Sequence, residues 1–302
     1  MISYTFIVNP AAGKGAGERI TRPLRVILEA FKMPYELVLT ERVGHATVLA
    51  RTASGEVVVG VGGDGTLNEI VNGLMGTGKA LGIVPAGSGN DFIRSVGIPR
   101  GLARAVEKLR SGLRRLVDVG SVRCLGATGP DSDEFQKPRW FLNGVGVGFD
   151  AAVAARIKEI RYLRGTPLYM AAVFQTLGRY QNPRLTVDID GDHREGRHLL
   201  IAIGNGTCAG GGFYLTPRAS VSDGLLDFCL IGDVGKLRIL RLMPLVLWGK
   251  HVSKEGVNYV RGRNIVISSE DRFHVHADGE IVGRGVTRVE VGLLDEKLPV
   301  IF

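Results

Sequence analysis

Three glycine-rich segments of this chain combine clustered backbone N–H groups with a few charged side chains. They read "VNPAAGKG" at 8–15, "GVGGDGT" at 60–66 and "PAGSGNDF" at 85–92, and each follows an apolar run. Glycine lets the backbone approach a ligand closely, and N–H groups ahead of a helix bind anions. Because the carboxyl ends of parallel strands meet at one edge of a sheet, the three segments are predicted to converge on a phosphate-bearing ligand.

The middle segment carries one carboxylate, Asp64, among its glycines. A carboxylate placed directly against phosphates would repel them, so Asp64 is expected to act through a Mg²⁺ ion. Its neighbours Gly62, Gly63, Gly65 and Thr66 are expected to donate N–H and hydroxyl groups to the phosphates of a nucleotide. The structural alternative is an aspartate in an ordinary glycine turn.

Two familiar nucleotide motifs fit these segments less well. Residues 60–65 satisfy the G-x-G-x-x-G spacing of dinucleotide-binding folds, but that fingerprint needs an acidic residue about 20 positions further on. The window there reads "GIVPAGSGND", with no acid before Asp91. The first segment is no Walker A loop, because Val8 stands where its first glycine belongs and no hydroxyl follows Lys14 directly.

The elements that must position these segments change in type along the chain. Before residue 120, short apolar runs alternate with helix-like segments, which predicts βαβ units and a largely parallel sheet. After residue 121 the text is mostly β-rich with Gly, Asp and Asn turns, which predicts an antiparallel sandwich or barrel-like domain. We therefore expect an α/β domain at 1–120, rejoined by 292–302, and an all-β domain at 121–291.

The bulk composition is that of a globular protein. With 302 residues, 45% of them hydrophobic, the chain is long enough for two cores. Its three cysteines, Cys124, Cys208 and Cys229, form no C-x-x-C pair, which disfavours a disulfide framework or a zinc site and fits a cytoplasmic protein. Neither a secretion signal nor a membrane-spanning helix is predicted. The net charge of +8 suits phosphate ligands, nucleic acid or an anionic lipid surface.

Several longer motifs occur in an order that resembles the diacylglycerol kinase catalytic-domain superfamily of bacterial lipid kinases. They are "VNPAAGKG", "GGDGTLNEIVNGL", "GIVPAGSGNDFIRSVGIP", "VDVG", "FLNGVGVGFDA", "VSDGLLDFCLI" and "HADGE". Sphingosine and ceramide kinases share this fold, and NAD kinases share the GGDGT core, but the likeness to NAD kinases stops near Thr66. The resemblance implies an N-terminal NAD kinase or diacylglycerol kinase-like α/β domain followed by a C-terminal β-sandwich-like domain.

The resemblance also implies roles for individual residues. Asp118 is expected to join Asp64 in a magnesium network. Asp223 is expected to hold a structural Mg²⁺ together with Ser220 and Leu225, through nearby backbone carbonyls. Asn68, Asn90 and Asp91 are expected to brace the loops or to touch the nucleotide. The residues expected to contact ATP are Asn9, Pro10, Ala11, Ala12, Gly13, Lys14, Thr40, Gly63, Asp64, Gly65, Thr66, Leu67, Asn68, Glu69 and Ser88.

The segment "FHVHADGEIVG" supplies the candidate base. Asp278, Gly279 and Glu280 form a predicted turn between two strands, and Glu280 matches the residue that accepts the hydroxyl proton in the family. A simple D-G hairpin turn would explain the same residues. The turn must face the GGDGT loop for Glu280 to serve as the base. His274 and His276 share one face of the strand, but no third ligand for a metal is evident.

The segment "KLRILRLMPLVLWGKH" at 236–251 mixes basic residues with Leu, Met and Trp, as an interfacial membrane segment does. The alternative is a helix packed on the β-rich domain. Helical stretches are expected at Ala151–Leu177 and Gly235–Trp248, and Pro244 is expected to kink or end the second.

Together these features predict an ATP- and Mg²⁺-dependent lipid kinase that transfers the γ-phosphate of ATP to a lipid hydroxyl, most simply from diacylglycerol to phosphatidic acid. The alternatives are a sphingoid-base, ceramide or other lipid acceptor, an NAD kinase-like enzyme, and a nucleotide-binding regulator without catalysis. The expected partner is a lipid at an anionic membrane surface, reached by peripheral association from the cytoplasm, and not nucleic acid. A homodimer through exposed edge strands is a further expectation.

Overall fold

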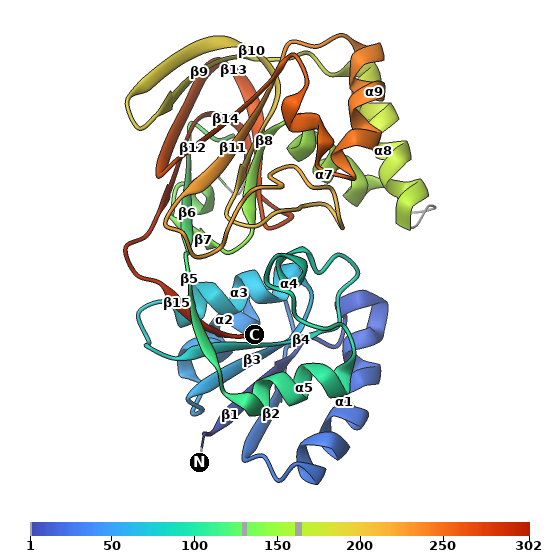
Figure 1. Ribbon diagram of the computed structural model, residues 1–302, viewed down its shortest axis with the longest axis vertical. Coiled ribbons are helices and arrows are strands. Elements are labelled where there is room, and N and C mark those ends of the chain that lie inside the picture. Colours follow the sequence, from blue (N-terminus) through green and yellow to red (C-terminus); the bar gives the residue numbers. More distant parts are fainter. Residues whose placement is uncertain (1, 129–131, 161–164) are drawn as a thin grey trace.

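The computed structural model describes residues 2–128, 132–160 and 165–302 and contains two sheets, one above the other in Figure 1. The lower sheet has six strands in the order β2-β1-β3-β4-β15-β5, and the upper sheet has nine. This architecture confirms the predicted combination of an α/β part and a β-rich part.

The lower sheet is parallel in its first four strands. Strands β1, β3 and β4 are wholly buried because helices cover both faces of the sheet, which explains their continuous runs of apolar residues and glycine. One core lies against α2 and α3, and the other lies against α1 and α5. The elements are β1 Tyr4–Val8, α1 Ala12–Ala30, β2 Tyr35–Leu39, α2 His45–Thr52, β3 Val57–Gly62, α3 Asp64–Leu74, β4 Ala80–Pro85, α4 Asp91–Val96, α5 Leu102–Ser111, β5 Arg114–Val117 and β15 Leu298–Ile301.

The upper sheet is antiparallel and curves around a core of Val, Ile, Leu and Phe side chains. Three helices, α7, α8 and α9, pack beside it and bury a second apolar layer against β10 and β11 (Figure 1). The elements are β6 Gly120–Leu125, α6 Ser132–Phe135, β7 Arg139–Phe141, β8 Gly144–Gly148, α7 Phe149–Glu159, α8 Gly165–Arg179, β9 Arg184–Ile189, β10 Asp192–Gly204, β11 Leu226–Gly232, α9 Lys236–Val246, the 3₁₀ turn η1 Lys250–Ser253, β12 Val257–Gly262, β13 Asn264–Ala277 and β14 Glu280–Leu293.

The chain crosses between the two sheets twice. The run "RLVDVGSV", a single apolar stretch in the sequence, divides into β5 of the lower sheet and β6 of the upper sheet, with Asp118 between them. After β14 the chain returns to the lower sheet, where β15 pairs parallel with β4 and antiparallel with β5 (Figure 1). We propose that the two sheets are the centres of the domains 1–120 with 292–302 and 121–291.

Some helices differ from their predicted extents. The stretch expected as one helix at Ala151–Leu177 contains two helices, α7 and α8, and residues 161–164 between them lie outside the described residues. Pro244 lies in the last turn of α9, which ends two residues later, as expected for proline. Within the described part of the chain, no helix is long and apolar enough to cross a bilayer.

Candidate active site

The three glycine loops meet at the carboxyl edge of the lower sheet, so their predicted convergence is confirmed. Asn9 in the first loop donates a hydrogen bond from Nδ2 to Thr66 Oγ1 in the second, over 3.0 Å. Gly63 of the second loop lies directly against Gly87 of the third, where a Cβ at Gly87 would overlap Gly63 Cα. Only glycine allows this approach, so the loops are held together by backbone contact.

The first loop has an unusual backbone. Gly13, Lys14 and Gly15 have φ angles of 55°, 58° and 85°, which places three successive residues in the left-handed region. Lys14 is not a glycine, so its conformation is costly and must be held by its surroundings. A Cβ at Gly13 would overlap the carbonyl oxygen of Ala86, which fixes the loop against the third segment. The side chain of Lys14 is exposed.

Two carboxylates face one another where the second and third loops meet. A Cβ at Gly89 would lie 3.1 Å from Asp64 Oδ2 and 3.7 Å from Asp91 Oδ2, so both oxygens point to the same place. The N–H of Phe92 donates to Asp64 Oδ1 over 3.2 Å, and the N–H of Gly211 donates to Asp91 Oδ2 over 2.8 Å. This second contact brings a loop of the β-rich part to the site.

Both carboxyl groups are held where ionisation is costly. Burial, with the charge of Asp91 next in size, raises the pKa of Asp64 to about 6. Burial also raises the pKa of Asp91, although the N–H of Gly211 partly offsets the effect. Two such groups with raised pKa values at one place form an electronegative site that a cation would relieve.

The carboxylates of Asp64 and Asp91 fit a Mg²⁺ ion whose other ligands come from water and a substrate. Within the described residues, no group of three or more His, Cys, Asp or Glu side chains could hold a metal ion alone. Mg²⁺ commonly takes one or two carboxylates and completes its octahedron with water and substrate phosphates. Asp64 and Asp91 meet that requirement beside loops whose N–H groups suit phosphates.

The turn that carries Glu280 is fixed by its aspartate. Asp278 and Gly279 have φ angles of 47° and 83°, the conformation of a two-residue hairpin turn between β13 and β14. Oδ1 of Asp278 accepts hydrogen bonds from the N–H groups of Asn143 and Gly144, over 2.9 and 3.0 Å. Its Oδ2 accepts a hydrogen bond from the N–H of Leu142. It accepts another from the side chain of Asn68 on α3, which belongs to the part of the chain around the other sheet.

Glu280 faces the middle glycine loop. Its Oε1 lies 3.1 Å from the position that a Cβ at Gly65 would occupy. The turn therefore faces the GGDGT loop, as a base at Glu280 requires. A carboxylate from the β-rich part lies beside the loop that carries Asp64.

Two family profiles match this chain in sequence. The profile described as "Diacylglycerol kinase catalytic domain" matches residues 3–122, and "YegS C-terminal NAD kinase beta sandwich-like domain" matches residues 143–300. A relative from Bacillus subtilis (strain 168), which carries the provisional name lipid kinase YtlR, is 30% identical over 300 residues, or 94% of each chain. The chain belongs to the diacylglycerol kinase catalytic-domain family.

Other members of the family agree in sequence and in fold. A protein of Mycobacterium tuberculosis (strain H37Rv) named diacylglycerol kinase is 28% identical over 91% of this chain and 88% of its own. The crystal structure of a diacylglycerol kinase from Bacillus anthracis str. Sterne superposes with a TM-score of 0.76 at 24% identity, over 99% of this chain and 96% of that one, which shows the fold. The resemblance, the β-sandwich-like fold of the second half and the assignment to the lipid kinase class of enzymes are thus confirmed.

Asp118, which was expected to share a magnesium network with Asp64, has other partners among the described residues. Its Oδ1 is 2.7 Å from Lys297 Nζ, and its Oδ2 accepts a hydrogen bond of 2.7 Å from the N–H of Gly224. Burial leaves it 2% exposed at the crossing between the sheets. The described hydrogen bonds and ion pairs do not join it to Asp64, and its part in a magnesium network stays a prediction.

Two cationic side chains from other segments, Arg261 of β12 and Lys297 before β15, reach the loop expected to hold a structural Mg²⁺. Arg261 Nη2 contacts Asp223 Oδ2, and its Nε lies 3.5 Å from the buried Asp227. Lys297 Nζ lies 3.5 Å from the carbonyl oxygen of Ser222. Arg261 already pairs with the one carboxylate of the expected donor set, so that set does not fit the ion in this arrangement. The roles of Ser220, Asp223 and Leu225 stay predictions.

The remaining residues expected at ATP are spread around the three loops. Glu69 is turned away, because its Oε2 accepts from the N–H of Ala46 at the start of α2. Thr40 follows β2 and donates its N–H to the carbonyl oxygen of Val8. Leu67 is buried in the core below the loop, whereas Ser88 is exposed. Pro10, Ala11 and Ala12 lie in the first loop and the first residue of α1.

Two buried asparagines that the sequence did not single out hold backbone segments of the β-rich part, and one of them reaches the crossing at Asp118. Asn205 is fully buried and donates to the carbonyl oxygens of Asp118 and Leu142, over 2.8 and 2.6 Å. Asn143 donates to the carbonyl oxygen of Cys208 over 2.6 Å. Each asparagine lies beside a glycine at a strand end, as turn residues do, so local sequence gives no sign of these long-range contacts.

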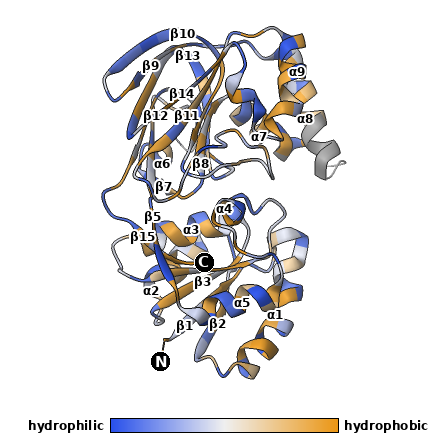
Figure 2. Cartoon of the chain, in the orientation of Figure 1, coloured by the Kyte–Doolittle hydropathy of each residue, from blue (hydrophilic) through white to orange (hydrophobic). Residues whose placement is uncertain are grey.

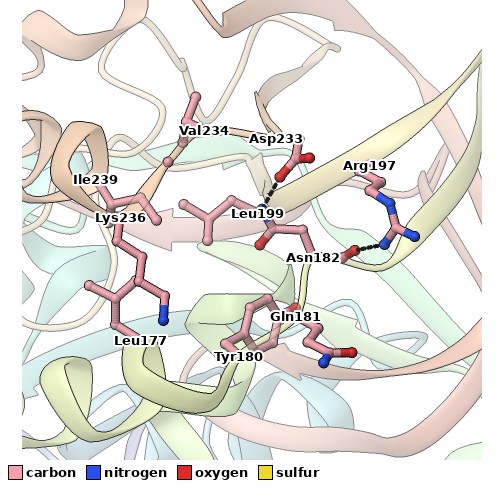
Figure 3. A pocket seen from close by; sticks show the side chains of 11 residues that line it. Leu177, Tyr180, Gln181, Asn182, Arg197, Leu199, Asp233, Val234, Lys236 and Ile239 are labelled. Atoms are coloured by element: carbon pink, nitrogen blue, oxygen red, sulfur yellow. Dashed lines mark hydrogen bonds between the residues drawn. The ribbon is translucent and has the colours of Figure 1, made fainter.

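A cavity of about 480 Å³ lies away from these carboxylates, between the end of α8 and the start of α9 (Figure 3). Asn182 links its walls by accepting from Arg197 on its carbonyl oxygen and donating to Asp233. Lys236 extends between Leu177 and Ile239 in Figure 3. The cavity combines apolar walls with exposed charge, and its position separates it from the reacting groups.

Proposed function

We propose that this chain is an ATP- and Mg²⁺-dependent lipid kinase that transfers the γ-phosphate of ATP to a lipid hydroxyl. The observation that carries the proposal is the meeting of Glu280 with Gly65, on the loop that also carries Asp64. A carboxylate for the proton, carboxylates for a metal and N–H groups for phosphates are the parts that phosphoryl transfer needs, and all three stand at one place.

The reaction assigns one task to each part. The glycine loops and Lys14 hold the triphosphate, and the carboxylate of Glu280 accepts the proton of the lipid hydroxyl. The hydroxyl oxygen forms a bond to the γ-phosphorus while the bond to the bridging oxygen of ADP breaks, which gives ADP and a phosphorylated lipid. Mg²⁺, held by Asp64 and Asp91, would neutralise charge on the phosphates.

Diacylglycerol is the proposed acceptor, with phosphatidic acid as its product. Support comes from the relatives named diacylglycerol kinase, which align over about nine-tenths of this chain. A sphingoid base, ceramide or another lipid is the alternative, and an NAD kinase-like activity is a further one. We assign no regulator role, because Asp64 and Glu280 are both in place.

The outer face of α9 supports association with an anionic membrane. Ile239, Leu242 and Val246 pack inward, while Leu237 and Trp248 are 74% and 76% exposed. Leu240 and Leu247 and, on α8, Phe174 are exposed apolar side chains of the same layer, and Lys236, Arg241 and Lys250 are exposed basic ones. Figure 2 shows this mixture of hydrophobic and hydrophilic residues on α9. Such a face suits the boundary between headgroups and acyl chains.

We propose a homodimer in which edge strands of two copies of the chain pair with one another. Strands β2 and β5 lie at the two edges of the lower sheet, and β12 lies at one edge of the upper sheet. An edge strand can pair with a second copy of the chain.

The testing experiment follows labelled phosphate from ATP to diacylglycerol, sphingosine, ceramide, phosphatidylglycerol and NAD. Glu280→Gln is expected to lower kcat about 10²- to 10⁴-fold with ATP binding unchanged, because it removes the base. Glu290→Gln is the matched control, since Glu290 lies further along the same strand and pairs with Arg288 on the surface. Equal rates for both variants would refute the role of Glu280, and transfer to NAD alone would refute a lipid acceptor.

A further inference from the structure

We propose that His276 and Asp150 form a subsite for an uncharged hydrogen-bonding group of the acceptor lipid, next to its reacting hydroxyl. This inference rests on the proposed function and narrows its substrate class. The pair is not part of the phosphate loops or of the carboxylates assigned above.

The two side chains meet near the end of β13, just before the turn that leads to Glu280. His276 precedes Asp278 by two residues, and Asp150 lies in the first turn of α7, directly after β8. Nε2 of His276 is 3.2 Å from Asp150 Oδ2, and the two side chains are 10% and 12% exposed. A Cβ at Gly146, the strand partner of His276, would overlap both polar atoms, so the glycine of β8 leaves the space that the pair occupies.

One polar atom of this pair lacks a partner. Among the described residues, Nδ1 of His276 is buried and has no hydrogen-bond partner, whereas Nε2 is engaged by Asp150. His276 is 8% exposed and lines a cavity of about 20 Å³ together with Asn143 and Cys208. That volume holds one water-sized group, and a buried polar atom without a partner is costly, so the cavity suits a small polar group of a ligand.

Two residues that line the cavity contact segments that carry the proposed reacting groups. Asn143 donates its N–H to Asp278 Oδ1 over 2.9 Å, which connects it to the turn of Glu280. Cys208 Sγ lies 3.7 Å from the carbonyl oxygen of Asp91, which connects it to the metal-binding carboxylates. Ala202, which also lines the cavity, belongs to the apolar layer beneath α7 and α8, a direction suited to acyl chains.

The charge of the cavity selects the class of headgroup. Asp150 contributes a carboxylate, and among the described residues that line the cavity there is no Lys or Arg. A phosphodiester brought there would meet the carboxylate of Asp150 in a desolvated place, with no lysine or arginine of that lining to offset its charge. Because Nε2–H faces the carboxylate of Asp150, Nδ1 of the neutral ring accepts from a hydroxyl or an amide N–H, whereas an ester carbonyl can accept from Nδ1 only when the ring is protonated. Ceramide therefore fits the subsite with a neutral ring and diacylglycerol with a protonated ring, and the charged phosphodiester of phosphatidylglycerol fits neither.

Two amide variants test the two ring nitrogen atoms of His276 individually. His276→Asn retains a polar atom near the place of Nδ1, and His276→Gln retains one near the place of Nε2. We expect His276→Gln to keep the contact with Asp150 and the melting temperature but to raise the KM for the lipid about tenfold, the effect of one lost hydrogen bond. His276→Asn is expected to keep the lipid KM nearer to the parent value, and both should leave the KM for ATP unchanged.

The contrary outcomes are distinct. A normal lipid KM in His276→Gln, with a lowered melting temperature in His276→Asn, would show that the ring only supports α7 and would overturn the inference. Transfer to phosphatidylglycerol at a rate comparable with diacylglycerol would overturn it as well. In both cases the proposed lipid kinase stands, whereas a parent protein that phosphorylates no lipid in the panel refutes the proposed function and the subsite together.

Discussion

Asn68 on α3 and Asp278 in the β13–β14 turn are joined by a hydrogen bond of 3.0 Å from Nδ2 to Oδ2, across 210 residues of sequence. Asn68 is 1% exposed, and its Oδ1 accepts a second bond from Nε of Arg139. The helix that begins at the GGDGT loop is thereby tied to the turn that carries Glu280. This contact therefore helps to set the distance between the loop and Glu280, which lie on different sheets.

The Asp278→Asn variant should test this positioning. An amide would direct an NH₂ group at donors that now face a carboxylate, which costs about 1–3 kcal/mol of folding stability. The displaced turn should lower kcat at least about tenfold while the KM for ATP is retained, because small shifts of a catalytic group are costly. Thermal unfolding and steady-state kinetics measure both effects, with Asp133→Asn on exposed α6 as the control. An unchanged kcat would mean that the turn does not position the base.

Close backbone approach between loops gives a second prediction. A Cβ at Gly87 would overlap Gly63 Cα and lie 2.7 Å from Asn90 Oδ1, so Gly87→Ala must push two phosphate loops apart. We expect a loss of about 1–3 kcal/mol in stability and weaker ATP binding, measured by denaturant unfolding and nucleotide titration. Gly178→Ala is the matched control, because within the described part of the chain a Cβ there would meet nothing within 4 Å beyond its own helix backbone and chain neighbours, and alanine favours a helix. A wild-type response of Gly87→Ala would contradict backbone packing of the loops.

The sequence predicted the parts of the site that depend on local pattern. Apolar runs ending in glycine placed the three loops, since parallel strands share one carboxyl edge. The D-G pair predicted a hairpin, and its φ angles of 47° and 83° agree. The helix Asp91–Val96 was not foreseen, because six residues after a glycine loop show too short a period.

Contacts between residues far apart in the sequence could not be predicted from local sequence patterns. Nothing local in "RLVDVGSV" indicates that Val117 and Gly120 belong to different sheets, since both flank the same apolar run. Neither does the text around Arg261 reveal that its guanidinium reaches Asp223, 38 residues away. Such partners depend on tertiary packing, for which a single sequence without alignment carries no signal.

The cations near Asp223 predict how the fold responds to metal removal. With Arg261 and Lys297 at this loop, chelation by EDTA should leave the melting temperature of the nucleotide-free protein unchanged. Arg261→Gln should lose about 1–3 kcal/mol, because the buried Asp227 loses its cation, and added Mg²⁺ should restore part of it. Arg263→Gln, whose partner Asp295 is fully exposed, is the control. A drop in melting temperature on chelation of the parent would support a structural Mg²⁺ at Ser220, Asp223 and Leu225.

Trp248 provides the test of the membrane face. Its side chain is 76% exposed at the end of α9, so Trp248→Ser should cost the fold little but weaken binding to vesicles containing phosphatidylglycerol about tenfold. Cosedimentation measures the binding, and higher salt should weaken it further. Leu113→Ser removes an apolar side chain, 55% exposed, next to β5 of the lower sheet and should have no effect. Equal losses in both variants would contradict a docking role for α9.

The carboxyl of Asp64 predicts a pH dependence of stability. Burial, assisted by the charge of Asp91, raises its pKa from 3.8 to about 6, so the fold favours the protonated form. The stability this form contributes is fully present below pH 3.8 and is lost as the pH rises through about 6. Asp64→Asn keeps an uncharged side chain at every pH. We therefore expect the variant to exceed the metal-free parent in stability at pH 7 by about 2–3 kcal/mol, and to lose that advantage below pH 4. Urea unfolding from pH 3.5 to 8 measures the difference, with Asp133→Asn as the control.

Mg²⁺ should stabilise the parent and not the variant at pH 7, because it replaces the proton at the ionised carboxylate. Parallel stability curves for parent and Asp64→Asn would show that Asp64 ionises without cost and needs no cation.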